Sequence, residues 1–263
     1  MDRMDLDDAP DLERRFGGLR RLYGDAGYAR IRAARFAIIG VGGVGSWCAE
    51  ALARSGVAAL TLIDLDHVSE SNINRQIQAT SATIGQAKVQ ALRERIAAIH
   101  PACEVTCIEE FVDADNWPAL LAQPVDAVID ACDQVRAKAV IAAWALSTRS
   151  TLVIAGAAGG KRQPHAVQVE DLGLVTHDPL LASLRQRLRK QHGAARSGKI
   201  GVRCVFSKEA VVAPSEVCEI EGGSEAASDS SLNCHGYGSS VGVTATFGMV
   251  AASLALESAA AQK

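Results

Sequence analysis

Short apolar runs alternate with amphipathic segments through the first 160 residues. Strands of a parallel sheet covered on both faces are apolar almost throughout, whereas a surface helix repeats its apolar residues every three or four positions. Strands are therefore expected at 35–40, 59–64, 104–111, 125–132 and 151–159. Helices are expected at 45–56, 85–101 and 136–146. Because strand–helix units with right-handed crossovers build open α/β sheets, the pattern predicts a doubly wound, Rossmann-like, mostly parallel sheet.

The alternation changes after residue 160. Strands at 165–172 and 202–207, with a helix at 178–191 between them, predict a smaller C-terminal α/β extension that forms a second layer. A glycine- and serine-rich run at 221–231 is expected to be a surface loop. The chain is accordingly divided into an N-terminal helical arm (1–34), a core (35–160) and a C-terminal region packed on that core (161–263).

The segment 237–256 contains no charged residue and is long enough to cross a membrane. Its glycines and small polar residues, and the lack of arginine-rich flanks, favour a buried strand or helix that closes the domain. We therefore expect no stable membrane insertion, while peripheral membrane contact of this segment stays an open alternative.

Composition narrows the class of protein. A hydrophobic fraction of 48%, a charged fraction of 22% and 23 glycines suit a soluble α/β domain and exclude fibrous or disordered chains. The net charge of −3 means that a polyanion would need a local basic patch. The 7 cysteines include no C-x-x-C pair, which argues against a zinc ribbon and favours reduced thiols in the cytoplasm.

A glycine-rich turn joins the first expected strand to the first expected helix. Gly40, Gly42 and Gly45 form a G-x-G-x-x-G pattern that Gly43 extends. Glycine lets the backbone turn tightly and approach a phosphate, which then meets the positive end of the helix dipole. Asp64 ends the next strand, where a carboxylate accepts hydrogen bonds from ribose hydroxyls. Together these residues favour a nucleotide site over a merely structural turn, without identifying the nucleotide.

Polar and basic residues follow that aspartate. Asn72 and Arg75 lie in the next loop, and Lys88 opens the following helix. An arginine fork and a lysine point charge suit a triphosphate and the pyrophosphate it releases, whereas hydride transfer has no use for them. Taken singly, Arg75 would pair with Glu70 and Lys88 would lie on a solvated helix face. The combination favours phosphate binding over a nicotinamide-dependent dehydrogenase.

Two carboxylates follow the fourth expected strand, at the edge where open α/β sheets bind ligands. They belong to Asp130 and Asp133. A carboxylate there suits magnesium, which keeps several waters and bridges phosphates. The alternative is that Asp133 caps the following helix. We assign Asp133 to magnesium and Asp130 to a supporting or capping role.

Four segments together resemble the ubiquitin-activating-like superfamily of ATP-dependent adenylyltransferases. They are GVGGVGSWCAEALARSG, LIDLDHVSESNINRQ, GQAKV and VIDACD. The resemblance implies an enzyme that adenylates a carboxylate with ATP and Mg²⁺, works as a homodimer, and uses Arg75, Lys88 and Asp133 in catalysis, with Asp133 holding the metal. The implied nucleotide contacts are Gly40, Gly42, Gly43, Gly45, Asp64, Asp66, Asn72, Arg75, Gln76 and Lys88. The core is then the nucleotide-binding region and 161–263 the substrate-side region.

Further segments resemble one branch of that superfamily, the bacterial tRNA threonylcarbamoyladenosine dehydratases. They are RFGGLRRLYG, AGAAGGKRQP, DPLLASLRQRLRK, GVRCVFSKEA and GVTATFGMVAA. The branch implies that ATP adenylates the threonine carboxylate of the modified adenosine in tRNA, and that ring closure expels AMP with net loss of water. The alternative is activation of the C-terminal glycine of a small ubiquitin-like sulfur carrier, by enzymes that usually carry paired zinc cysteines. A sulfur-transfer protein is a further partner to consider.

Basic residues outside the nucleotide site are the expected tRNA contacts. Lys161 and Arg162 follow the fifth strand, and Arg185, Arg189 and Lys190 lie on a helix whose leucines face inward. Phosphate contacts would make tRNA binding salt-sensitive. An ordinary solvated helix face explains the last three equally well.

Two cysteines are candidate nucleophiles, since ubiquitin-activating relatives transfer the acyl group to cysteine. Cys204 lies in an apolar run and is expected to be buried, whereas Cys234 stands beside His235 in a loop. Ring closure by an internal atom needs neither thiol, so neither is assigned a catalytic role.

Overall fold

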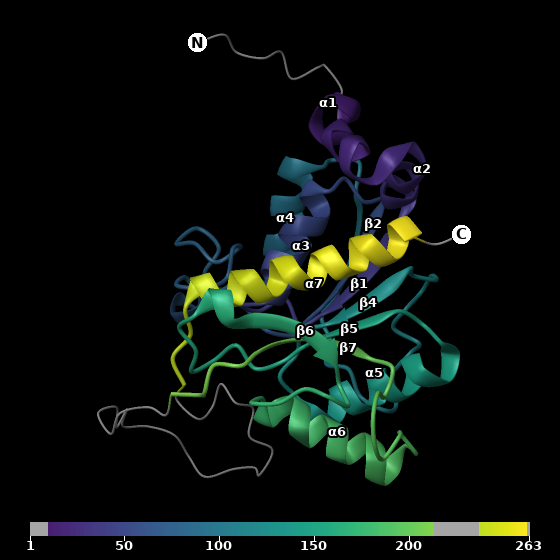
Figure 1. Cartoon of the computed structure of the whole chain (residues 1–263). Helices are drawn as coiled ribbons and strands as arrows, with labels where there is room; N and C mark the ends of the chain where they lie inside the picture. The colour runs from purple at the N-terminus through teal and green to yellow at the C-terminus, as the bar shows by residue number, and fades with distance from the viewer. Residues whose placement is uncertain (1–9, 213–236, 262–263) are drawn as a thin grey trace.

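A seven-stranded sheet runs through the computed structural model, which describes residues 10–212 and 237–261 (Figure 1). The strands are β1 (Arg35–Ile39), β2 (Ala59–Ile63), β3 (Glu104–Ile108), β4 (Ala127–Asp130), β5 (Leu152–Ala155), β6 (Val167–Asp171) and β7 (Arg203–Ser207). Their order is β3-β2-β1-β4-β5-β7-β6, and every neighbouring pair is parallel except β6 with β7. The predicted doubly wound, mostly parallel sheet is confirmed.

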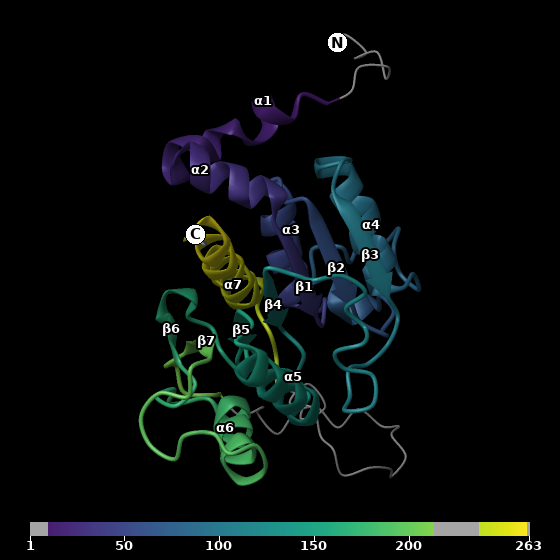
Figure 2. The same ribbon diagram turned by 90° about the vertical axis from the view of Figure 1, so that its right-hand side faces the viewer.

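Helices cover both faces of this sheet (Figure 2). The first face packs against α3 (Gly45–Arg54), α4 (Lys88–Ile99) and α7 (Val241–Ala261). The second packs against α5 (Val135–Thr148) and α6 (Pro179–Gln191). In β1, Phe36 and Ile38 enter the first core while Ala37 and Ile39 enter the second. Burial on both faces explains why the strands are apolar throughout.

The N-terminal arm is bound to the core through its own aromatic anchor. It comprises α1 (Leu12–Phe16), a 3-10 turn (Gly17–Leu19) and α2 (Arg20–Ala33). Phe16 is buried with its ring centroid 4.7 Å from that of His100, and the Arg32 guanidinium lies over the same ring. Arg30 Nε donates to Ala260 O at 2.9 Å, so α2 and α7 lie side by side (Figure 1).

The long apolar helix α7 is a core helix. By length and hydropathy it meets the criteria for a membrane span, but its apolar window is 50% buried inside the structure. Phe247 and Ala251 are fully buried in the first core. A Cβ at Gly248 would lie 2.5 Å from Val44 O, so α7 approaches α3 closely at this glycine. The sequence predicts either a buried strand or a buried helix at 237–256, and the structure shows a helix there.

The C-terminal extension joins the main sheet and does not form a second layer. β7 pairs in parallel with β5, and β6 adds an antiparallel edge. The sequence predicts these strands but not this position, because a strand's neighbours are set by long-range packing. The loop predicted at 221–231 lies outside the described residues.

Candidate functional site

A cavity of about 400 Å³ opens at the carboxyl ends of the central strands. One side, here called the polar half, carries most of the polar residues predicted from the sequence. It consists of Gly40, Gly42, Gly43, Asp64, Asp66, Asn72, Arg75, Gln76, Lys88 and Asp133. A second group of lining residues, called the apolar half, carries no charge and consists of Gly156, Ala157, Ala158, Gly159, Pro179, Leu180, Val211 and Tyr237. The hydroxyl of Ser239 lies next to Gly159 in this part of the lining. The fold thus brings together residues from both the core and the C-terminal region.

The glycine turn between β1 and α3 is built for close approach. Gly40 has a φ of 79°, and a Cβ there would lie 2.8 Å from Cys132 N. A Cβ at Gly45 would lie 1.8 Å from Gly40 O, so both positions require glycine for steric reasons. Gly42 is different, because its nearest neighbour would be Gln76 Nε2 at 3.8 Å. Its missing side chain leaves backbone exposed to the cavity.

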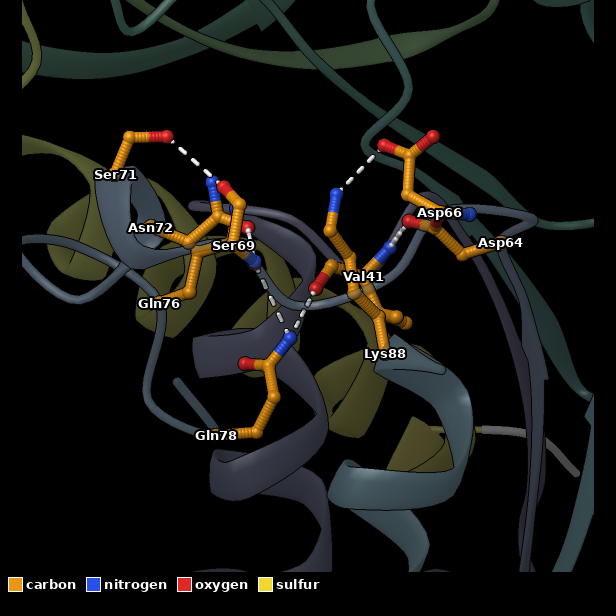
Figure 3. Close-up of polar contacts among 9 residues, drawn as sticks. All are labelled: Val41, Asp64, Asp66, Ser69, Ser71, Asn72, Gln76, Gln78 and Lys88. Atoms are coloured by element: carbon orange, nitrogen blue, oxygen red, sulfur yellow. Dashed lines mark hydrogen bonds and ion pairs between the residues drawn. The ribbon is translucent and has the colours of Figure 1, made fainter. Parts of the chain in front are cut away.

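Two side chains hold this turn from opposite sides (Figure 3). Asp64 Oδ2 accepts from Val41 N at 2.7 Å, and Gln78 Nε2 donates to Val41 O at 2.9 Å. Asp64 Oδ1 also accepts from Asp66 N at 2.9 Å. Burial raises the pKa of Asp64, and the Lys88 ammonium and the two backbone donors offset only part of that rise. Each carboxylate oxygen keeps capacity for a further donor, as ribose recognition requires.

Lys88 begins α4 with a nearly buried side chain. Its Nζ lies 2.6 Å from Asp66 Oδ2, and the Asp66 side chain is 54% exposed (Figure 3). The ammonium is therefore presented at the cavity edge with one exposed carboxylate beside it. A triphosphate offers the same ammonium a denser negative charge, so Lys88 is placed to exchange one partner for the other. This is not the solvated helix face weighed as an alternative.

The turn that precedes α4 orients Asn72 and Arg75. Asn72 Oδ1 accepts from Ser69 N at 3.1 Å and closes a capping box around the turn Glu70–Asn72 (Figure 3). Arg75 Nη1 donates to Ser71 O at 2.8 Å and to Asn74 Oδ1 at 2.9 Å. Partial burial lowers the pKa of Arg75, yet an arginine stays charged at any physiological pH. Because both acceptors are neutral, they orient the guanidinium without neutralising it.

The two predicted carboxylates have different surroundings and different roles. Asp133 lines the cavity, one residue before the N-cap position of α5, which Gln134 occupies. Asp130 is wholly buried and pairs with Lys138, whose Nζ lies 3.1 Å from Asp130 Oδ1. Burial is the largest influence and opposes the charged form of Lys138, but the Asp130 carboxylate and the nearby thiols together outweigh it, and the pKa of Lys138 is raised. Asp130 is thus a structural partner, and Asp133 is the carboxylate within reach of a ligand.

A magnesium ion fits this donor set. The described residues form no group of three or more His, Cys, Asp or Glu that would hold a metal by itself. Magnesium is usually held by one or two carboxylates together with substrate phosphates and water, and Asp133 supplies such a carboxylate at the cavity.

The apolar half has no charged member among the residues that define it. The turn Gly156–Gly159 presents backbone and methyl groups to the cavity, with Leu180 and Tyr237 beside it. Such a surface accepts a flat, uncharged group more readily than a charged one.

The basic residues predicted to contact tRNA are mostly engaged within the protein. Lys161 is 2% exposed, so the direct phosphate contact allowed by the sequence is a wrong expectation for this side chain. Arg185 donates to Leu172 O and Val175 O, and Arg189 donates to Ala195 O, contacts that hold the loops around α6. Arg162 and Lys190 are exposed. For these two the tRNA contact stays a prediction.

The surroundings of Cys132 and Cys204 favour the protonated thiol. Cys132 lines the cavity, and burial together with the Asp130 charge raises its pKa well above the usual range. Burial likewise raises the pKa of Cys204. A neutral thiol is a poor nucleophile. The expected burial of Cys204 is confirmed. Cys234 lies outside the described residues.

Three buried polar residues that support the site were not predicted. They are Gln78, Lys138 and Asp178. A lysine inside the apolar run of α5 is a signal that the sequence offered, because an unpaired charge there would be costly. Asp178 before a proline is a helix-start signal, but its contact across the cavity wall depends on the tertiary fold.

Residues 15–261 match the ThiF family. The tRNA threonylcarbamoyladenosine dehydratase of Escherichia coli is 44% identical over 249 residues, which cover 92% of this chain and 92% of that protein. The enzyme of the same name from Haemophilus influenzae is 40% identical and covers 94% of each chain. A crystal structure of the E. coli dehydratase in complex with ATP has a TM-score of 0.83 at 42% identity over 94% of each chain. The likeness includes the arm and the C-terminal extension as well as the core.

Proposed function

The chain belongs to the ThiF family, and on that premise we propose that it is an ATP-dependent tRNA threonylcarbamoyladenosine dehydratase. It adenylates the threonine carboxylate of the modified adenosine in tRNA and cyclises the product with release of AMP. The observation that carries this function is one cavity that joins a polar half suited to a triphosphate with an apolar half suited to an uncharged base. Relatives of this name match along nearly the whole chain, which favours this reaction over sulfur-carrier activation.

The first step makes the carboxylate reactive. A carboxylate oxygen attacks the α-phosphorus of ATP, the bond to the β-phosphate oxygen breaks, and pyrophosphate leaves. Arg75 and Lys88 lie where they neutralise the charge that builds on the leaving group. Asp64 holds the ribose, and the backbone at Gly42 and Gly43 receives the phosphates.

The second step closes the ring. A nitrogen or oxygen of the threonylcarbamoyl group attacks the activated carbonyl, and AMP leaves with the former carboxylate oxygen. Because both reacting groups belong to one molecule held in one cavity, the step is effectively unimolecular. The net change in the nucleoside is loss of water. Protonated Cys132 fits a route without an enzyme thioester.

Magnesium at Asp133 is part of this proposal. When bound, the ion would screen the phosphate charges and support departure of pyrophosphate. The placement of Asp133 at the cavity, and the chemistry of a carboxylate beside phosphates, support the assignment.

Partners and location complete the proposal. The enzyme acts in the cytoplasm, where reduced thiols persist, and the described cysteines are free. It works as a homodimer, as the family resemblance implies. Exposed Arg162 and Lys190 contact tRNA phosphates, and a sulfur-transfer protein is a further proposed partner because the superfamily includes sulfur-carrier activators.

The test uses tRNA that carries threonylcarbamoyladenosine. We expect the enzyme to remove one water from the nucleoside only when ATP is present, as read by mass spectrometry. Arg75→Ala should lower the rate about a hundredfold or more, the usual cost of losing a transition-state donor. The matched control is Arg93→Ala on the exposed face of α4, which should retain activity. Pyrophosphate exchange that appears only with a small glycine-tailed protein would instead assign the enzyme to sulfur-carrier activation.

A further inference from the structure

A second buried ion pair lies behind the apolar half of the cavity. Lys161 Nζ is 3.8 Å from Asp178 Oδ2, and both side chains are wholly shielded from solvent. Neither residue lines the cavity, but Gly156–Gly159 on one side and Pro179–Leu180 on the other do. We call Gly156–Gly159 the acceptor wall. The pair therefore stands directly behind the two segments that form the apolar half.

Asp178 joins these two segments. Its Oδ1 accepts from Leu181 N at 3.0 Å and caps α6, while its Oδ2 accepts from Ala157 N at 2.9 Å. A Cβ at Gly156 would lie 2.2 Å from the same Oδ2, so the carboxylate packs against the backbone of the wall itself. One side chain thus fixes the wall relative to the start of α6.

Lys161 extends the connection to two further elements. Its Nζ donates to Ser207 O at the end of β7, at 3.3 Å, and lies 5.9 Å from the Phe247 ring centroid in α7. Removing the ammonium would leave the Asp178 carboxylate buried without its counter-charge, an arrangement that proteins avoid by moving the group or admitting water. Either response would displace Ala157 and the wall.

The polar half is held by a different set of contacts. Asp64 and Gln78 fix the glycine turn through Val41. This turn follows β1, whereas the acceptor wall follows β5, and β4 lies between these two strands in the sheet. A change at Lys161 or Asp178 therefore acts on one half of the cavity and leaves the supports of the other half in place.

We propose that Lys161 and Asp178 are positioning residues for the acceptor side of the reaction, holding the acceptor wall where the modified adenosine is received. The inference rests on the proposed function. It gives the buried lysine a role in substrate geometry in place of a phosphate contact.

The test measures both halves separately in the full-length enzyme. Variants Lys161→Met and Asp178→Asn are assayed for KM and kcat with tRNA carrying threonylcarbamoyladenosine, and for Kd with a nonhydrolysable ATP analogue. We expect kcat/KM for the tRNA to fall about tenfold to a hundredfold, the range found when a supporting shell is disturbed. The Kd for the analogue should stay within about twofold, because its contacts are untouched. Lys161→Gln, which keeps a donor toward Asp178 and Ser207, should lie between wild type and Lys161→Met.

Two controls separate positioning from stability. Glu50→Gln alters another buried carboxylate, paired with Arg54 and Arg95 away from the cavity, and should lower thermal stability without changing kcat/KM for the tRNA. Where a single variant fails to fold, the double variant Lys161→Met with Asp178→Asn leaves no unpaired buried charge and is assayed instead.

The inference is overturned if the variants keep the wild-type kcat/KM for tRNA, or if the tRNA and analogue parameters worsen together. A wild-type enzyme that leaves the nucleoside unchanged removes the proposed function, and this inference with it. The two failures are distinguishable because the first appears only in the variants.

Discussion

The two halves of the cavity are supported in different ways. In the polar half, Asp64 and Gln78 hold the glycine turn through Val41, and Asp66 contacts Lys88. All of these residues lie between positions 41 and 88. In the apolar half, the acceptor wall is held by Asp178 at the start of α6, and Lys161, which follows the wall in the chain, connects it to Ser207 at the end of β7. Under the proposed function, nucleotide binding is therefore assigned mainly to the first half of the chain, and substrate geometry to the packing of the C-terminal region.

A substitution at Lys138 is expected to affect both halves of the cavity, because this side chain contacts strands that lead to each half. Its Nζ contacts Asp130 Oδ1 at 3.1 Å and Ala155 O at 3.0 Å, at the ends of β4 and β5. Lys138→Met should lower the free energy of unfolding by about 3–5 kcal/mol, the cost of leaving a buried charge unpaired. It should also raise the Kd for the ATP analogue and lower kcat/KM for the tRNA. Urea denaturation and the two binding assays check this, and an effect on one half alone would contradict it.

Two substitutions in the glycine turn should distinguish an effect on folding from an effect on nucleotide binding. Gly45→Ala places a Cβ 1.8 Å from Gly40 O and should destabilise the fold by about 3 kcal/mol, the upper end of usual overpacking costs. Gly42→Ala meets no close atom, so it should fold normally yet weaken binding of an ATP analogue by filling space at the phosphates. Thermal unfolding and calorimetric titration distinguish the two. Equal destabilisation by both would argue against a cavity-facing Gly42.

Acidification should affect the polar half through Asp64. Its folded-state pKa is raised by burial, so the carboxylate protonates, and loses its charge toward ribose hydroxyls, at a higher pH than an ordinary aspartate near ~3.9. Affinity for an ATP analogue should fall as pH drops through that raised pKa. The contribution of Asp64 to the free energy of unfolding should instead increase as the pH falls, because protonation favours the folded state, in which its pKa is higher. The matched Asp64→Asn variant should lack this component of the pH profile, and an identical profile in both would contradict the assignment.

The smallest effect is expected at Cys132, although it lines the cavity between the halves. Its thiol is protonated and the proposed route forms no thioester. Cys132→Ala should therefore keep the dehydration rate within about threefold, a margin that allows for modest repacking. A loss comparable to that of Arg75→Ala would establish a catalytic thiol.

The sequence predicts the sheet and the polar half well, for physical reasons. Strands buried on both faces carry nearly continuous apolar runs, and the glycine turn with Asp64 has fixed spacing because the chain is short between them. The sequence assigns Asp130 to a supporting or capping role, but it does not identify the residue that Asp130 contacts. That residue is Lys138, which α5 brings back beneath the end of β4.

The apolar half was less predictable because no local motif indicates that its supporting residues are buried and paired. Lys161 follows a glycine run and looks like an exposed cation, and only the tertiary fold places Asp178 and Phe247 around it. The insertion of β7 beside β5 is likewise decided by packing and not by local propensity.

The central claim is that the threonine carboxylate is activated as an adenylate. It is tested most directly by tracing oxygen from that carboxylate. tRNA whose threonylcarbamoyladenosine carries a heavy-oxygen-labelled carboxylate is incubated with ATP and the enzyme, and the products are analysed by mass spectrometry. The account predicts that one labelled oxygen appears in AMP while the nucleoside loses one. Label recovered in inorganic phosphate or pyrophosphate, or in water with ATP intact, would contradict it.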